Sequence, residues 1–168
     1  GSARPLRFES KHYDEILVVS PFLKSSGGGV AALDWLANFA GDNNRILCSR
    51  AEELNAIGAS KLAGWQCFAM NSDIVNGEER NEIGGDTRQK EIGIQNLHAK
   101  LIVVAANGKA IWHIGSANAT TAALGDGNNR EPKNTEAMLM LSGPRQKLGP
   151  QVLLQEWMPN EGIKVFRP

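Results

Sequence analysis

The sequence predicts an α/β fold with a mixed, largely parallel sheet flanked by helices. A continuous apolar run at residues 16–19 is typical of a strand buried on both faces. Two further strands are expected at the mostly apolar segments 45–48 and 65–70. Helices are expected between these runs, at 30–39, where apolar residues have helical spacing, and at 51–62. Strands that alternate with helices in this order are the pattern of layered α/β folds.

Each of these first elements is followed by a residue that disfavours its continuation. Pro21 follows the first strand, Gly41 the first helix and Gly64 the second helix. Glu52 and Glu53 lie in the expected first turn of that second helix, where negative charge interacts favourably with the helix dipole. The boundaries of the elements therefore agree with the apolar pattern.

Two stretches lack the periodicity of either element. Residues 71–95 form a long expected loop that carries Arg80, Arg88 and Lys90, and loops of this length are usually functional or disordered. Residues 25–29 are all Ser or Gly and lie between a strand and a helix. They do not match the phosphate-binding P-loop pattern, so we expect a flexible connection there.

Composition limits the class of protein. The chain of 168 residues is expected to form a single domain, and it has 18 basic and 18 acidic residues. A general positive coat for nucleic acid is therefore absent, and any phosphate binding is expected to be local. The apolar runs are too short to span a bilayer, so no membrane partner is expected.

Cysteine usage and the first residues bear on where the protein works. Cys48 and Cys67 lie in apolar, strand-like surroundings, where buried reduced thiols are more common than a disulfide. We therefore expect a cytoplasmic protein. Gly1 and Ser2 resemble the scar of a cleaved tag, which leaves open that the chain is a fragment and that other domains of a longer parent protein act with it.

The segment after the long loop predicts a β-hairpin. Residues 97–103 alternate in the manner of a strand, and a second strand is expected around 111–114. Asn107 and Gly108 lie between them. This pair is a strong signal for a type I′ turn, because that turn needs positive φ at both central residues.

The hairpin gathers polar groups at one place. His98 and Lys100 alternate with apolar residues and so point to the same face of the first strand. The second strand runs into a Gly-Ser-Ala-Asn turn at 115–118, before an expected helix at 119–124. A His, a Lys, Asn118 and a helix N-terminus are the groups expected of a phosphate site with a candidate nucleophile.

Each of these residues also has an ordinary structural interpretation. A lone His in a strand is usually structural, and Asn118 alone would be a common helix N-cap. Lys100 is harder to dismiss, because a buried ammonium is costly without an anion. For His113, on the second strand, we expect a structural role rather than a place in the pocket.

The last part of the chain contains one more expected strand and one more helix. A polar loop at 125–133 precedes a strand at 135–141, with Glu136 near its start. A helix is expected at 146–157, and 159–168 are expected to be a short tail.

The two polar motifs resemble the signature of the phospholipase D superfamily, which is H-x-K, four residues and D, with G-S-x-N shortly after. His98 and Lys100 match H-x-K, and residues 115–118 match G-S-x-N. The Asp position is occupied by Ala105. Family members that cut nucleic acid, such as the tyrosyl-DNA phosphodiesterases, also lack that Asp. A weaker resemblance extends to residues 14–36, a strand that ends in Ser-Pro-Phe before a helix, and to residues 134–136.

This resemblance implies a phospholipase D-like α-β-α sandwich and a metal-independent phosphodiesterase, with DNA the favoured substrate. His98 would be the nucleophile that forms a phosphohistidine, while Lys100, Ser116 and Asn118 would contact the phosphate oxygens. Glu136 matches an acidic residue of the family that orients a catalytic His, although an exposed carboxylate at a strand start is an equally good interpretation.

The sequence supports no cofactor and no metal site. A magnesium nuclease would need converging carboxylates, whereas the acidic pairs at 52–53 and 78–79 are adjacent in sequence. The three His are widely spaced and there is no C-x-x-C motif for zinc. A metal-free reaction, with His98 as the nucleophile, is therefore the mechanism that we expect.

Three further expectations concern substrate and assembly. The family mechanism uses two H-x-K motifs and this chain has one, since His12 is followed by Tyr-Asp. A homodimer is therefore expected to complete the site; the alternative is that a longer parent protein supplies the second motif and that this chain alone is monomeric and inactive. A phospholipase or phosphatidyltransferase stays open as the alternative enzyme. A catalytically inactive nucleic-acid-binding module, whose H-x-K motif survives as an anion site, is the alternative outside enzymes.

Overall fold

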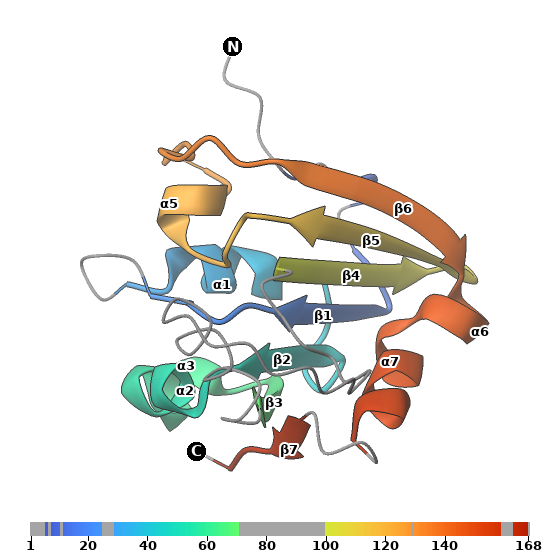
Figure 1. Ribbon diagram of the computed structural model, residues 1–168, viewed down its shortest axis with the longest axis horizontal. Helices are drawn as coiled ribbons and strands as arrows, with labels where there is room; N and C mark the ends of the chain where they lie inside the picture. The colour runs from blue at the N-terminus through green and yellow to red at the C-terminus, as the bar shows by residue number, and fades with distance from the viewer. Residues whose placement is uncertain are drawn as a thin grey trace, which may run out of the picture.

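The computed structural model of this chain is shown in Figure 1. It describes residues 6, 8–10, 12–24, 29–70, 100–128, 130–158 and 163–167. The expected loop at 71–95, with its three basic residues, and the candidate nucleophile His98 lie outside this described part. Most of the Ser- and Gly-rich connection at 25–29 also lies outside it.

Seven strands of the described chain form one sheet, in the order β6-β5-β4-β1-β2-β3-β7. Their bounds are β1 Glu15–Val19, β2 Arg45–Ser49, β3 Trp65–Met70, β4 Lys100–Ala106, β5 Lys109–Gly115, β6 Met138–Pro144 and β7 Ile163–Val165. The strands expected in the first half, the hairpin and a strand after the polar loop are all present. The expected tail supplies an additional edge strand, β7, which pairs with β3.

The α/β class and the mixed sheet are confirmed, but the prediction of a largely parallel sheet was wrong. Only the pairs β1–β2 and β2–β3 are parallel, and the other four neighbouring pairs of described strands are antiparallel. Helix-containing crossovers connect the two parallel pairs, whereas the two-residue turn between β4 and β5 can only join antiparallel strands.

The turn between β4 and β5 has the predicted geometry. Asn107 has φ 51° and Gly108 has φ 75°, so both central residues adopt the positive φ of a type I′ turn. Ala106 and Lys109 then face each other as the first pair of the ladder. The hairpin register follows from this turn and places Lys100 opposite Gly115.

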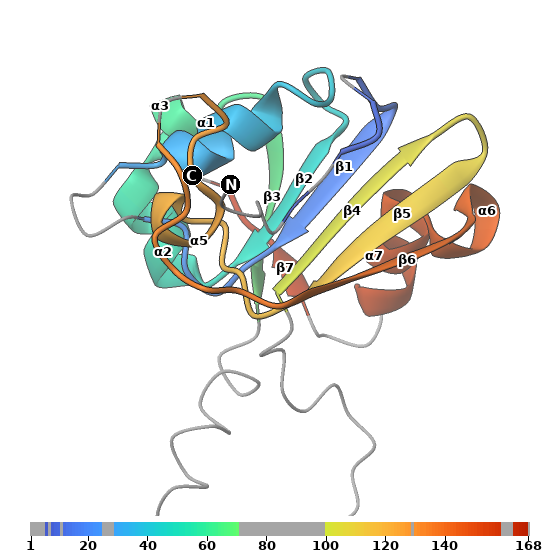
Figure 2. The same cartoon turned by 90° about the horizontal axis from the view of Figure 1, so that it is seen from above.

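Helices cover both faces of the sheet (Figure 2). Their bounds are α1 Ala31–Ala37, α2 Ala51–Ile57, α3 Ala59–Leu62, α5 Thr121–Leu124, α6 Arg145–Leu148 and α7 Pro150–Trp157. Two expected helices are each interrupted. Gly58, at φ 82°, separates α2 from α3, and Gly149 precedes Pro150 between α6 and α7.

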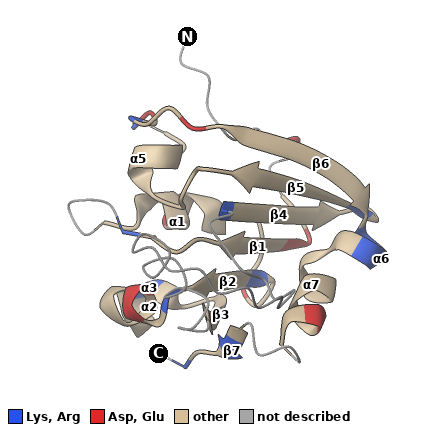
Figure 3. Ribbon diagram, in the orientation of Figure 1, with Lys and Arg blue, Asp and Glu red and all other residues tan. Residues whose placement is uncertain are grey.

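The two faces of the sheet form two apolar clusters. Leu33 and Leu36 of α1 pack in one cluster with Ile102 of β4, whereas Leu153 and Leu154 of α7 pack in the other. Successive apolar residues of the central strands β1, β2 and β4 alternate between the clusters, as the pleat requires. The charged residues of the central strands lie at strand ends rather than along their length (Figure 3).

The two cysteines are free and buried, as expected. Cys67 belongs to the cluster on the α1 face and Cys48 to the cluster on the α7 face, so the sheet separates them. Burial raises the pKa of the Cys67 thiol to about 11 and raises the pKa of Cys48 further. Both thiols are therefore protonated at neutral pH.

One end of the sheet collects the segments that matter for the site. The parallel strands β1, β2 and β3 end there, β4 begins there, and β5 ends there, because Leu101 pairs with Val19 and Lys100 pairs with Gly115. We call this end the carboxyl edge and the opposite end the amino edge. In open α/β sheets, ligands commonly bind at the carboxyl ends of the parallel strands.

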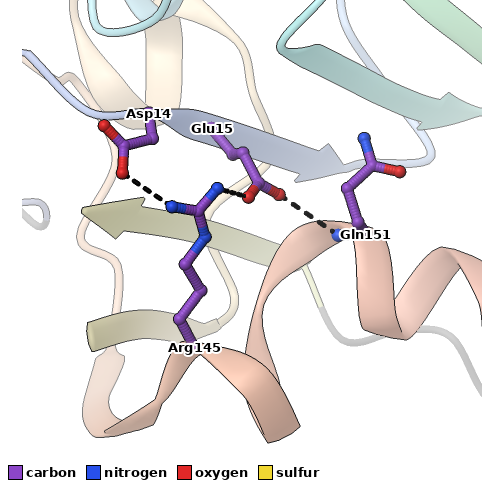
Figure 4. A network of polar contacts seen from close by, with 4 residues as sticks. All are labelled: Asp14, Glu15, Arg145 and Gln151. Carbon is purple, nitrogen blue, oxygen red and sulfur yellow. Dashed lines mark hydrogen bonds and ion pairs between the residues drawn. The ribbon is translucent and has the colours of Figure 1, made fainter. Parts of the chain in front are cut away.

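At the amino edge, an ion-pair network attaches α6 and α7 to β1 (Figure 4). The Arg145 guanidinium contacts Asp14 at 2.7 Å and also contacts Glu15. The backbone N–H of Gln151 donates to the other oxygen of Glu15 at 3.3 Å. Glu15 is buried, so these donors satisfy a carboxylate that has little access to water.

In the described part of the chain, no helix is both long enough and apolar enough to cross a membrane.

Candidate functional site

Lys100 is the first residue of β4 and lies at the carboxyl edge. Its side chain is half-buried, and it shares the face of Ile102 and Val104, which belong to the α1-side cluster. His98 precedes it by two residues but lies outside the described part. The placement of His98 beside Lys100 therefore stays a prediction from strand alternation.

Gly115 ends β5 directly opposite Lys100 and allows an unusually close backbone approach. A Cβ atom at this position would lie 1.9 Å from the carbonyl oxygen of Ala137 and 2.7 Å from the sulfur of Met138. Only glycine fits without a shift of the backbone that leads into β6. The first residue of the G-S-x-N motif therefore lets the chain before β6 pass beside the site.

Ser116 and Glu136 form a hydrogen-bonded pair. The Ser116 hydroxyl donates to one oxygen of Glu136 and accepts from the backbone N–H of Ala137 at 3.1 Å. The side-chain amide of Asn134 donates to the other Glu136 oxygen at 3.1 Å. Two sequence-predicted site residues are thus brought together, with Glu136 held by donors from both sides.

This pairing limits the hydrogen bonds that the Ser116 hydroxyl can offer to a ligand. A hydroxyl has one proton to donate, and in this structure that proton is directed to Glu136. A phosphate oxygen would have to compete with a carboxylate for it. Whether Glu136 also contacts His98, as the resemblance implies, stays a prediction.

Asn118 is half-buried in the segment between β5 and α5. Its Oδ1 atom lies 3.4 Å from the Ser20 hydroxyl at the end of β1. The side-chain amide of Asn118 also carries an NH₂ group, a donor that it can offer to a ligand. Lys100 thus begins β4, and Asn118 follows the end of the neighbouring strand β5 at the same edge.

The interpretation of Asn118 as a helix N-cap is corrected by the structure. The helix α5 begins at Thr121, and Thr120 is its N-cap, with its hydroxyl accepting from the N–H of Ala123 at 3.4 Å. The expected helix at 119–124 is therefore only the four residues of α5. Such a short helix has too few aligned peptides to contribute a strong dipole, so the predicted helix N-terminus is not a part of the site.

Ser20 is a central residue that the sequence analysis missed. It is 1% exposed, its hydroxyl accepts from the N–H of Ala119 at 2.9 Å, and the same hydroxyl donates to the carbonyl of Phe22 at 2.6 Å. Its own carbonyl accepts from the Ser49 hydroxyl at 2.7 Å. The sequence signal was available, since a Ser-Pro-Phe segment follows a fully buried strand.

His113 lies in the core and not at the site. It is buried on β5, and its ring lies edge-on to Phe8, with the ring centroids 5.4 Å apart. This agrees with the structural role expected for it. Among the described residues, no three or more His, Cys, Asp or Glu side chains are grouped so that they could hold a metal ion.

The carboxyl edge carries side chains of the kind that bind anions in proteins. Lys100 supplies a positive charge, Asn118 an amide donor, and the hydrogen bonds of Ser20 and Glu136 hold the surrounding segments in place. No protein-family model matches this chain, and a search of curated proteins finds no significant match either.

Proposed function

We propose that this chain is a metal-independent phosphodiesterase of the phospholipase D type that cuts nucleic acid, with DNA as the favoured substrate. The observation that carries the proposal is the pairing of Lys100 with Gly115 in the hairpin register. It brings Lys100, the last residue of the H-x-K motif, next to Gly115, the first residue of the G-S-x-N segment. These motifs need this proximity to act on one phosphate.

The layered arrangement supports the finer assignment of fold. Helices pack on both faces of a mixed sheet, and the candidate residues lie where strands β1 to β3 end. This is compatible with the α-β-α sandwich that we propose for the chain. The family assignment itself rests on the two motifs.

The proposed reaction has two steps. The neutral imidazole of His98 attacks phosphorus, the bond to the leaving oxygen breaks, and a general acid protonates that oxygen. Water then hydrolyses the phosphohistidine and regenerates the imidazole. Lys100 and Asn118 stabilise the negative charge that develops on the non-bridging oxygens in both steps.

A second copy of the chain would supply the general acid. The sequence contains one H-x-K motif, and a two-fold homodimer places the same surface of each subunit face to face. One His98 would act in the neutral form and the other in the protonated form. The rate would then have a bell-shaped dependence on pH that belongs to the pair of histidines.

The first experiment is a cleavage assay of a labelled single-stranded oligonucleotide in excess EDTA, with phospholipid vesicles as the parallel substrate. We expect cleavage of the oligonucleotide that EDTA does not inhibit. Loss of activity in EDTA would contradict the metal-free mechanism. Turnover of phospholipid alone would assign a phospholipase, and oligonucleotide binding without turnover would assign a binding module.

The second experiment tests the shared site. Sedimentation at micromolar concentration is expected to give a dimer, and specific activity is expected to fall on dilution as the dimer dissociates. A monomer whose specific activity does not depend on concentration would contradict the two-subunit mechanism while leaving the phosphodiesterase assignment intact.

A further inference from the structure

An exposed aromatic ring lies at the carboxyl edge, immediately after β1. Phe22 is 47% exposed, and it is the only aromatic residue among the large exposed hydrophobic residues of the described chain. The others are aliphatic side chains or methionines on β6, at the end of α7 and on β7. An aromatic ring left in water at the edge where ligands bind is a candidate contact for a planar group.

The backbone around Phe22 is held on both sides. Its carbonyl accepts from the buried Ser20 hydroxyl at 2.6 Å. After it, the N–H groups of Leu23 and Lys24 both donate to one oxygen of Glu53, at 3.0 and 3.3 Å. Leu23 is fully buried. The exposed ring is therefore attached to an ordered segment, which lowers the entropy lost on binding.

A guanidinium group lies against the same ring. The central carbon of Arg50 is 5.6 Å from the Phe22 ring centroid, within the range of a cation–π interaction. Arg50 directly precedes α2, and its Nε is 3.7 Å from a carboxylate oxygen of Glu52. The guanidinium orients the Phe22 ring from one side, while about half of the surface of Phe22 remains open to solvent.

Phe22 and the candidate phosphate site share one hydrogen-bonded frame. The Ser20 hydroxyl that donates to the carbonyl of Phe22 also accepts from Ala119, the residue after Asn118. In the antiparallel pair β1–β4, Val19 faces Leu101, and the next residues outward are Ser20 and Lys100. Ser20 therefore lies level with Lys100, and Phe22 is two residues further along the chain.

From these observations we infer that Phe22, oriented by Arg50, is a stacking platform for a nucleobase next to the phosphate that is cleaved. The inference rests on the proposed function and specifies its substrate as single-stranded nucleic acid. Unpaired bases expose their faces, and stacking on an aromatic ring is tolerant of sequence. An Arg beside the ring adds affinity for the neighbouring backbone phosphate.

The test compares two ligands and two substitutions. Binding is measured by fluorescence anisotropy with an oligothymidylate and with an abasic oligonucleotide of the same length and charge, in a His98→Ala background that prevents cleavage. Phe22→Leu retains an apolar side chain without an aromatic face, and Phe22→Trp retains the face. Met158→Leu, at a residue that is 43% exposed at the end of α7, is the matched control.

We expect Phe22→Leu to weaken binding of the oligothymidylate by about tenfold, the order of one lost base–aromatic stack. Binding of the abasic oligonucleotide should not change. Phe22→Trp should bind the oligothymidylate at least as tightly as the unsubstituted protein, and Met158→Leu should have no effect on either ligand.

The failures of the two proposals are distinguishable. Equal effects of Phe22→Leu on both ligands, or no effect on either, would overturn the platform while the phosphate site stands. Absence of binding to both ligands, together with absence of cleavage by the unsubstituted protein, would overturn the proposed function and the platform with it. Loss of binding to phospholipid vesicles in Phe22→Leu, with unchanged oligonucleotide binding, would reassign the ring to a lipid contact.

Discussion

The two ends of the sheet use polar groups differently. At the amino edge, Arg145 is ion-paired to Asp14 and to the buried Glu15, so charges of opposite sign neutralise each other within the chain. At the carboxyl edge, Lys100 and Asn118 are half-buried, and the hydrogen bonds around them involve hydroxyls and the backbone. From the proposed function we expect the amino edge to serve stability and the carboxyl edge to serve binding.

If this division is correct, substitutions at the two edges should affect different measurements. Variants of the proposed substrate contacts at the carboxyl edge should lose turnover with little change in the free energy of unfolding, and amino-edge variants should do the opposite. The following substitutions test this, from the largest expected effect to the smallest.

The largest effect is expected from His98→Ala. Removal of the proposed nucleophile should abolish turnover, while the thermal unfolding midpoint and circular dichroism stay unchanged. His12→Ala, at an exposed histidine that precedes β1, is the matched control and should be fully active. More than a few per cent of residual activity in His98→Ala would contradict the role of His98.

Arg145→Ala should have the largest effect on stability. It leaves Glu15 buried without its cation, and breaking a buried pair costs on the order of 3 kcal/mol, as measured by urea denaturation. Turnover of the remaining folded protein should be unchanged. Asp14→Asn is the control within the same network, because the Asp14 side chain is 53% exposed and an exposed pair contributes about 0–1 kcal/mol. Equal effects of the two variants would mean that burial of Glu15 is not what makes the network important.

Lys100→Ala and Asn118→Ala should each lower kcat by about 10²–10³, the effect of removing one preorganised group from a developing charge. Their unfolding free energies should change little, since neither side chain is fully buried. Lys109→Ala, at an exposed lysine at the other end of the hairpin, is the control for the loss of a positive charge. A loss of stability without a loss of kcat would move both residues to a structural role.

Gly115→Ala tests whether the carboxyl edge depends on close backbone approach. The new methyl group would lie against the Ala137 carbonyl, and overpacking of this kind costs about 1–3 kcal/mol. Because Ser116 directly follows Gly115 and Glu136 directly precedes Ala137, turnover should fall as well. Gly108→Ala is not a suitable control, since Gly108 has positive φ; Gly41→Ala, where a Cβ meets no atom within 4 Å, is suitable and should be nearly neutral.

The smallest effect is expected from Thr120→Ala, which tests whether the helix cap and the candidate site are separate. Thr120→Ala should destabilise the protein by about 1 kcal/mol, because it removes the N-cap of α5. It should leave kcat near the unsubstituted value. The opposite pattern, with Thr120→Ala inactive and Asn118→Ala only destabilised, would exchange the roles assigned to these two residues.

Local chemistry was sufficient to predict much of the fold. The buried runs of β1, β2 and β3 follow from their apolar composition, and the β4–β5 hairpin follows from Asn107 and Gly108, whose positive φ fits a type I′ turn. These features depend on residues close in sequence. The α/β class and the register of Lys100 against Gly115 could therefore be derived before any coordinates were known.

The pairing of distant strands was decided only by the tertiary structure. The short run at 163–165 has weak strand character alone, and it becomes β7 because β3 offers it an unpaired edge. Likewise β6 begins three residues later than expected, at Met138, where the chain has passed Gly115. Propensity is a weak guide where long-range packing determines the outcome.

In the candidate site, too, some features were predictable from the sequence and others depend on the tertiary structure. The two motifs predicted His98, Lys100, Ser116 and Asn118 from sequence alone, because each motif is local, and the weaker resemblance at 134–136 predicted Glu136. The contact of Ser116 with Glu136, the role of Ser20 and the ordered position of Phe22 join residues 20 to 99 positions apart. Such contacts exist only when the sheet is assembled, since its hydrogen-bonded ladder brings the ends of distant strands to a common edge.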